Sequence, residues 1–183
     1  MNAVPESFES LLSPTEVDAC LARMADAIRA ECPDGTGVAL IGIQTGGVLL
    51  ARQLAKALES VWPRPVPVGE LDINMHRDDL HRQFAPTVHP THIPFDIGGL
   101  TVVLVDDVLA SGRTTRAALD ALSDLGRPRC VQLAVLIDRG HRELPIQADF
   151  VGRRVTAGPA DRVHVSSDDG TTFKVVLEKA SVG

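Results

Sequence analysis

The sequence lacks the features that mark secreted, membrane-spanning or zinc-binding proteins. Its three cysteines are odd in number and lack paired spacing, which fits reduced thiols better than a disulfide framework or a zinc site. No apolar run approaches the roughly 18 residues needed to span a bilayer. The first residues show neither the basic region nor the apolar core of a signal peptide. We therefore expect a cytoplasmic protein without a membrane partner.

The sequence also has fewer basic than acidic residues. Lys and Arg total 18 against 24 Asp and Glu, which gives a net charge of −6. An acidic chain gains no general attraction to nucleic acid, so RNA binding would need a local basic patch. A length of 183 residues with 44% hydrophobic residues suits a single domain built around one sizeable core.

The most informative stretch runs from residue 100 to residue 125. Residues 101–105 form an apolar run dominated by valine, which predicts a strand buried on both faces. We expect this strand to end at Asp106 and Asp107, and a loop of small and hydroxyl residues, 110–115, precedes a helical pattern. Backbone N–H groups at a helix start bind phosphate, whereas carboxylates bind sugar hydroxyls or Mg²⁺. The stretch therefore predicts a site for a phosphorylated sugar.

A second unit of the same kind precedes it. Residues 38–43 predict another buried strand, and Thr45, Gly46 and Gly47 separate it from a helix that runs to about Leu58. The two glycines allow the backbone to approach an anion closely, although on their own they could equally serve only a tight turn. The alternation of strands and helices predicts an α/β fold with a mainly parallel sheet.

The remaining segments are less specific. We expect residues 1–12 to be a loose arm, with a first helix starting at Ser13, and an Asp-Gly turn at 169–170 predicts a hairpin. Residues 72–99 are polar, with four histidines and three prolines, and predict a mobile flap beside the site. The histidine spacing matches no metal-binding pattern.

Several stretches together closely resemble the PyrR family, whose members are bifunctional pyrimidine-operon attenuation regulators and uracil phosphoribosyltransferases. The resemblance spans about residues 13–179 and is carried, besides the acidic-pair motif, by residues 67–73, 77–80, 93–97, 116–122, 132–146 and 148–152. It implies a type I phosphoribosyltransferase fold: a central sheet flanked by helices, a flap at about 72–99 and a C-terminal hood at about 138–179. It also implies a homodimer or homotetramer.

The same resemblance implies the substrates and the residues that bind them. Uracil would displace pyrophosphate from phosphoribosyl pyrophosphate (PRPP) to give UMP, with Mg²⁺ as cofactor. Asp106 and Asp107 would hold the ribose hydroxyls, directly or through Mg²⁺, and Arg77 would reach the pyrophosphate when the flap closes, solvent exposure being the alternative. The implied PRPP-binding residues are Thr45, Gly46, Gly47, Val102, Val103, Leu104, Val105, Asp106, Asp107, Val108, Leu109, Ala110, Ser111, Gly112, Arg113, Thr114 and Thr115.

The base would be bound at residues 149–152, which predict a short strand or bend. Phe150 would stack on it and Val151 would pair with it through backbone groups, with core packing as the alternative for Phe150. Ala110 replaces the acid of hypoxanthine-type enzymes and so argues against them, whereas adenine enzymes can carry alanine there. Gly46 stands where related loops often carry arginine, which removes a positive charge near the leaving group.

RNA recognition in the family depends partly on the first helix. Arg23 matches an RNA-contacting position, but Ala22 and Asp26 replace a hydrogen-bonding residue and a potential cation, and Asp26 would repel phosphate. Three functions therefore stay open: a uracil phosphoribosyltransferase, a UMP-sensing regulator that binds pyrimidine leader mRNA with little catalysis, and a phosphoribosyltransferase for another base. We rank the first above the other two.

Overall fold

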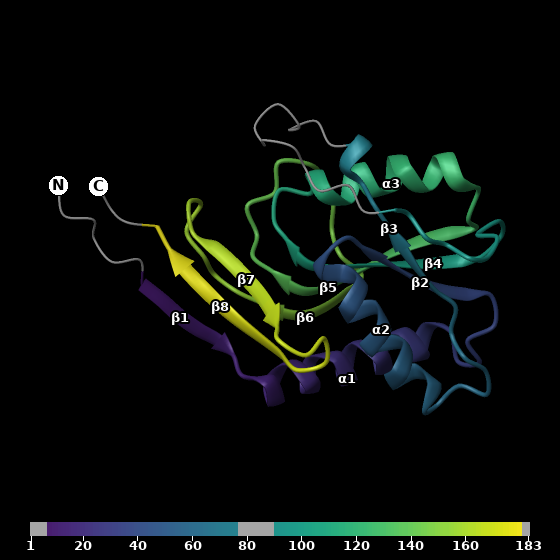
Figure 1. Cartoon of the computed structure of the whole chain (residues 1–183), viewed down its shortest axis with the longest axis horizontal. Coiled ribbons are helices and arrows are strands. Elements are labelled where there is room, and N and C mark those ends of the chain that lie inside the picture. The colour runs from purple at the N-terminus through teal and green to yellow at the C-terminus, as the bar shows by residue number, and fades with distance from the viewer. Residues whose placement is uncertain (1–6, 77–89, 181–183) are drawn as a thin grey trace.

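A parallel five-stranded sheet forms the centre of the computed structural model, which describes residues 7–76 and 90–180 (Figure 1). The strand order is β3-β2-β4-β5-β6, and every neighbouring pair is parallel. This confirms the predicted α/β fold with a mainly parallel sheet. The strands are β2 (Val38–Ile43), β3 (Val68–Leu71), β4 (Thr101–Leu109), β5 (Cys130–Asp138) and β6 (Phe150–Arg154).

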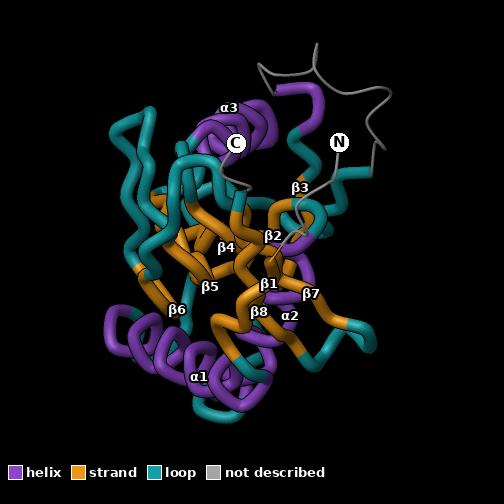
Figure 2. Tube along the Cα trace, turned by 90° about the vertical axis from the view of Figure 1, so that its left-hand side faces the viewer, coloured by secondary structure: helices purple, strands orange, loops and turns teal. Residues whose placement is uncertain are grey.

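Helices cover both faces of this sheet, as Figure 2 shows. The helices α1 (Pro14–Glu31) and α2 (Gly46–Glu59) lie on one face, and α3 (Arg113–Leu125) lies on the other. The valines of β4 alternate between the two layers: Val103 and Val105 pack on the α1/α2 side and Val102 on the α3 side, all with 0% exposure. Burial on both faces explains why residues 102–105 of β4 are all apolar.

The first helix begins where the sequence predicted. The backbone N–H of Ser13 donates to Glu16 Oε2 at 2.9 Å, and the Ser13 hydroxyl donates to the same oxygen at 2.8 Å. The two bonds lower the pKa of the Glu16 carboxyl. No helix in the described part of the chain is long and apolar enough to cross a membrane. Its three cysteines are free thiols, as expected.

A second, antiparallel sheet joins the two ends of the described chain. Its order is β1-β8-β7, with β1 (Ser7–Leu12), β7 (Arg162–Ser167) and β8 (Phe173–Lys179). The expectation of a loose arm is wrong for residues 7–12, because their backbone pairs with β8 and Leu12 is buried against the core; residues 1–6 lie outside the description. The sheet lies beside the main sheet at the left of Figure 1.

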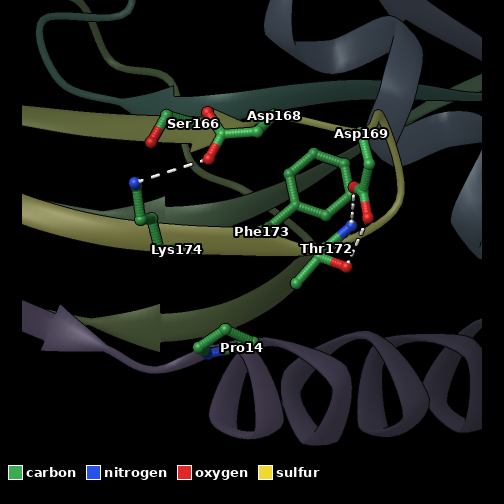
Figure 3. Close-up of a pocket in the computed structure, with 7 residues that line it drawn as sticks. All are labelled: Pro14, Ser166, Asp168, Asp169, Thr172, Phe173 and Lys174. Atoms are coloured by element: carbon green, nitrogen blue, oxygen red, sulfur yellow. Dashed lines mark hydrogen bonds and ion pairs between the residues drawn. The ribbon is translucent and has the colours of Figure 1, made fainter.

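The predicted hairpin is confirmed, and Asp169 organises its turn. The Asp169 carboxylate accepts hydrogen bonds from the backbone N–H groups of Thr171 (2.8 Å) and Thr172 (2.6 Å) and from the Thr172 hydroxyl (2.7 Å; Figure 3). These bonds hold the pKa of Asp169 far below its usual range. The turn and Pro14 line a cavity of about 310 Å³, and Asp168 beside it forms an ion pair with Lys174 at 3.8 Å.

The hairpin turn gives a testable pH dependence. Replacement of Asp169 by alanine should lower the urea midpoint at pH 7, whereas Asp168→Ala, at a side chain that is 94% exposed, should change it little. A depressed carboxyl pKa stabilises the fold above the unfolded value of about 3.9, and the stabilisation fades as the pH falls below it. The difference between wild type and Asp169→Ala should therefore shrink at about pH 2.5. A constant difference between the two pH values would contradict this role.

Candidate active site

The acidic pair lies inside β4 and not after it. We expected the strand to end at Asp106 and Asp107, but it continues to Leu109 because β5 pairs with it as far as the partners Leu109 and Asp138. On its other side, β2 pairs with β4 only as far as Gly42 and Val105. The two aspartates therefore occupy the first part of β4 that has no β2 partner, at the carboxyl edge of the sheet. In open α/β sheets this edge is where ligands bind.

Backbone hydrogen bonds fix both carboxylates. Asp106 is 6% exposed, and its Oδ1 accepts the N–H of Asp107 at 2.9 Å. Asp107 is half-buried, and its Oδ1 accepts the N–H of Val108 at 2.8 Å. The bonds set the orientation of both carboxylates, and oxygen atoms of this kind accept hydrogen bonds from sugar hydroxyls or bind Mg²⁺.

The start of α2 lies directly against this pair. A Cβ built on Gly46 would come 2.4 Å from Asp107 Oδ2, and one built on Gly47 would come 2.2 Å from the carbonyl oxygen of Val105. Only glycine allows so close an approach. The peptide bond between Gln44 and Thr45 is cis. The free N–H groups of the α2 N-terminus thus lie beside the acidic pair, where they favour an anion.

The loop after β4 leads into a second helix N-terminus. Gly112 has φ +92°, in the left-handed region that glycine adopts without strain, and α3 begins at Arg113. The arrangement directs backbone N–H groups outward from the helix start. Two helix N-termini therefore flank the aspartates, one before them in the chain and one after them.

Several residues of the predicted PRPP motif do not reach this site with their side chains. Val102, Val103, Leu104 and Val105 are 0% exposed and form the buried part of the strand that carries Asp106, so their part in PRPP binding stays a prediction. Leu109 is likewise in the core. Thr115 is 3% exposed, faces a cavity of about 220 Å³ together with Leu104 and Leu119, and its hydroxyl has no partner within the described residues. The contact of Thr115 with phosphate stays a prediction, and in this structure its side chain is buried.

Comparison with known proteins decides the family. The phosphoribosyl transferase domain profile matches residues 9–166. "Bifunctional protein PyrR" of Roseiflexus sp. (strain RS-1) is 54% identical over 85% of this chain and 85% of that protein. The protein of the same name from Chloroflexus aurantiacus is 51% identical over 92% of this chain and 94% of that protein. The chain belongs to the PyrR family. It is therefore a phosphoribosyltransferase, as the sequence predicted.

Solved structures agree on the fold. The hypoxanthine phosphoribosyltransferase of Trypanosoma cruzi superposes with a TM-score of 0.69 at 18% identity and covers 94% of this chain and 97% of that one. A hypoxanthine-guanine phosphoribosyltransferase of Bacillus anthracis gives a TM-score of 0.64 at 18% identity, over 85% and 86% of the two chains. This PyrR-family chain thus has the type I phosphoribosyltransferase fold.

The two residues predicted to bind the base point to opposite faces of β6. Phe150 is 4% exposed and packs in the core on the α1 side, which is the alternative that the sequence left open. Val151 is half-buried and packs on the α3 side. The ring of Phe150 fills the core in this structure, so base stacking by it stays a prediction, as does pairing through Val151.

The flap prediction falls partly outside the described residues, because 77–89 are not among them. Arg77 lies within 77–89, and its reach to pyrophosphate stays a prediction. In the second described part of the segment, His92 exchanges backbone hydrogen bonds of 2.8 Å with Glu70 of β3. His76, the last residue described before the segment, contacts Asp124 of α3 at 2.9 Å.

The predicted RNA contact has partners within the chain. The Arg23 guanidinium donates to the carbonyl oxygen of Gly152 at 2.9 Å and to that of Ala19 at 3.1 Å, so it ties α1 to β6. Asp26 is exposed on the same helix and lies 3.5 Å from Arg29. The RNA-binding role of Arg23 stays a prediction.

One contribution to the site was missed from the sequence. The loop after β5 is attached to the loop at 110–115, and the sequence did not predict this attachment. The N–H groups of Glu143 and Leu144 donate to the carbonyl oxygen of Ser111 at 3.0 and 3.1 Å, and Glu143 pairs with Arg113 at 2.7 Å. In the sequence, this loop is marked only by its mixed charges after a buried strand, and these charges do not predict which residues it contacts.

Proposed function

We propose that the chain is a uracil phosphoribosyltransferase that converts uracil and PRPP to UMP and pyrophosphate. The observation that carries the proposal is that the N-terminus of α2 lies against Asp107 of β4. The N-terminus of α3 follows the end of the same strand in the chain. PRPP has the matching pattern, because a pyrophosphate and a 5′-phosphate flank its ribose hydroxyls. Membership of the PyrR family supports uracil as the base.

In this proposal the protein acts by position and charge. Asp106 and Asp107 accept hydrogen bonds from the ribose hydroxyls, while N–H groups at 45–47 and 111–114 bind the two phosphate ends. Uracil N1 attacks C1 of the ribose as the bond from C1 to the pyrophosphate oxygen breaks, and the N1 proton passes to solvent. The sugar becomes positively charged in the transition state, and the two nearby carboxylates stabilise that charge.

The residues fit a magnesium ion that arrives with its substrate. The described part of the chain contains no group of three or more His, Cys, Asp or Glu side chains that could form a dedicated metal site. Mg²⁺ is often held by one or two carboxylates together with substrate phosphates, and Asp106 and Asp107 supply that donor set. When bound with PRPP, the ion neutralises charge on the leaving pyrophosphate.

Regulation through pyrimidine leader mRNA is the second candidate. The name "Bifunctional protein PyrR" of the relatives favours it, whereas Asp26 on α1 and the engagement of Arg23 disfavour that helix as a contact. We rank catalysis first. A cytoplasmic location and a homodimer or homotetramer belong to the same proposal.

A single assay separates the candidates. We expect the purified protein, given PRPP, Mg²⁺ and one nucleobase at a time, to form nucleotide with uracil and not with adenine, guanine or hypoxanthine. Turnover with another base alone would transfer the assignment to that base. Absence of turnover, combined with a UMP-dependent mobility shift of a pyrimidine leader RNA, would select the regulator instead.

A further inference from the structure

Arg142 contacts the loop at 110–115, which the proposed function assigns to the 5′-phosphate and which we call the phosphate loop. Its guanidinium binds four separate groups. Its Nη1 donates to the carbonyl oxygen of Ala110 at 2.9 Å and to that of Gly140 at 3.2 Å, and its Nε donates to that of Ile146 at 2.9 Å. Its Nη2 forms an ion pair with Asp138 Oδ1 at 2.7 Å. The two side chains are only 24% and 12% exposed, so solvent screens the pair less than it would on an open surface.

The contact with Ala110 bears on the direction of the loop's N–H groups. In a trans peptide the carbonyl and the following N–H point in opposite directions, and the Gln44–Thr45 bond is the cis exception within the described residues. When Arg142 holds the carbonyl of Ala110, the N–H of Ser111 must therefore point away from Arg142. The N–H groups of Glu143 and Leu144 hold the Ser111 carbonyl in the same way, which turns the N–H of Gly112 outward.

Packing reinforces this hold. A Cβ built on Gly112 would come within 3.3 Å of Ile146 Cβ, so the loop lies directly on the segment that Arg142 binds. An N–H group that bends inward would have to break these contacts. Arginine suits the position because its planar fork offers five donors in fixed directions, whereas lysine is a point donor and cannot bond all four groups at once.

We propose that Arg142 is a positioning residue that presets the phosphate loop for the 5′-phosphate of PRPP, with Asp138 orienting Arg142. It acts through the peptide groups of Ala110 and Ser111 and does not touch substrate. The proposal rests on the proposed function, because it takes residues 110–115 as the loop that binds the phosphate. Its consequence is selective: binding of the phosphorylated sugar depends on Arg142, and binding of the base does not.

The test compares Arg142→Met and Arg142→Lys with Arg29→Met, which removes an arginine with a 49% exposed side chain on α1. Calorimetry with ribose 5-phosphate and steady-state kinetics give the dissociation constant, the KM for PRPP and the KM for uracil. Arg142→Met should weaken ribose 5-phosphate binding and raise the KM for PRPP by about 10-fold or more. This is the loss expected when one backbone N–H of the loop no longer donates to the charged phosphate. The KM for uracil should stay near the wild-type value, Arg142→Lys should fall between, and Arg29→Met should match wild type.

Other outcomes overturn the proposal. If Arg142→Met binds ribose 5-phosphate as Arg29→Met does, the loop does not depend on Arg142. If the losses for PRPP and uracil are equal and follow the folded fraction measured by circular dichroism, the residue only supports the fold. Should Arg142→Met not fold, Arg142→Lys and Asp138→Asn decide by the same selectivity. Wild-type protein that neither binds ribose 5-phosphate nor turns over PRPP would remove the proposed function too, whereas active wild type with an unaffected variant removes this inference alone.

Discussion

Asp107→Asn should lower kcat/KM for PRPP by about 100-fold or more, the scale seen when one preorganised electrostatic group is removed. Asparagine has nearly the same shape, and its carbonyl oxygen can still accept the N–H of Val108 that Asp107 Oδ1 accepts at 2.8 Å. The fold should therefore persist while the negative charge beside the sugar is lost. Asp106→Asn should behave alike, because its contact with the Asp107 N–H is of the same kind. Steady-state kinetics together with thermal melts measures both effects.

A matched control is available on α3. Asp120 pairs with Arg116 at 3.5 Å at a position where both side chains are about half exposed, and exposed pairs of this type contribute little. Asp120→Asn should thus keep full activity and stability. If Asp107→Asn also keeps full turnover, the acidic pair does not stabilise the sugar and the proposed mechanism is wrong.

The elements around the site could be predicted because their signals are local. The strand β2 has the predicted bounds, since every residue from Val38 to Ile43 is buried and none interrupts the apolar run. The start of α1 followed from Ser13 and Glu16, which bond to each other over three residues. The strand β1 could not be predicted in this way, because it is stabilised by pairing with β8, whose residues are more than 160 positions away.

The same distinction holds for the site. The acidic pair and the glycines at the start of α2 could be chosen as candidate site residues because each motif consists of consecutive residues. The directions of Phe150 and Thr115 were not, since they depend on which face of a strand or helix meets the core. The hydrogen bond from Arg142 to the carbonyl oxygen of Ala110 joins residues 32 positions apart, and no pattern in the sequence predicts it.

Alanine at two adjacent glycines should separate stability from activity. At Gly47 the added methyl would come 2.2 Å from the carbonyl oxygen of Val105, in the middle of the central sheet, where the backbone cannot yield. Gly47→Ala should therefore lower the free energy of unfolding by about 2 kcal/mol or more, as overpacking of a rigid core does. Urea denaturation measures this loss, and a variant as stable as wild type would show that α2 does not lie so close to β4.

At Gly46 the same methyl would meet a different neighbour, the Asp107 carboxylate at 2.4 Å. That side chain can rotate away at the loss of its hydrogen bond from the Val108 N–H, so Gly46→Ala should lower the free energy of unfolding less than Gly47→Ala does. Rotation takes the carboxylate out of its place beside the sugar, so kcat/KM for PRPP should fall by about 100-fold. Each variant is the control for the other, since both add one methyl to the first turn of α2. Loss of activity in proportion to loss of stability in both would mean that Gly46 only packs, and that Asp107 need not stay where this structure has it.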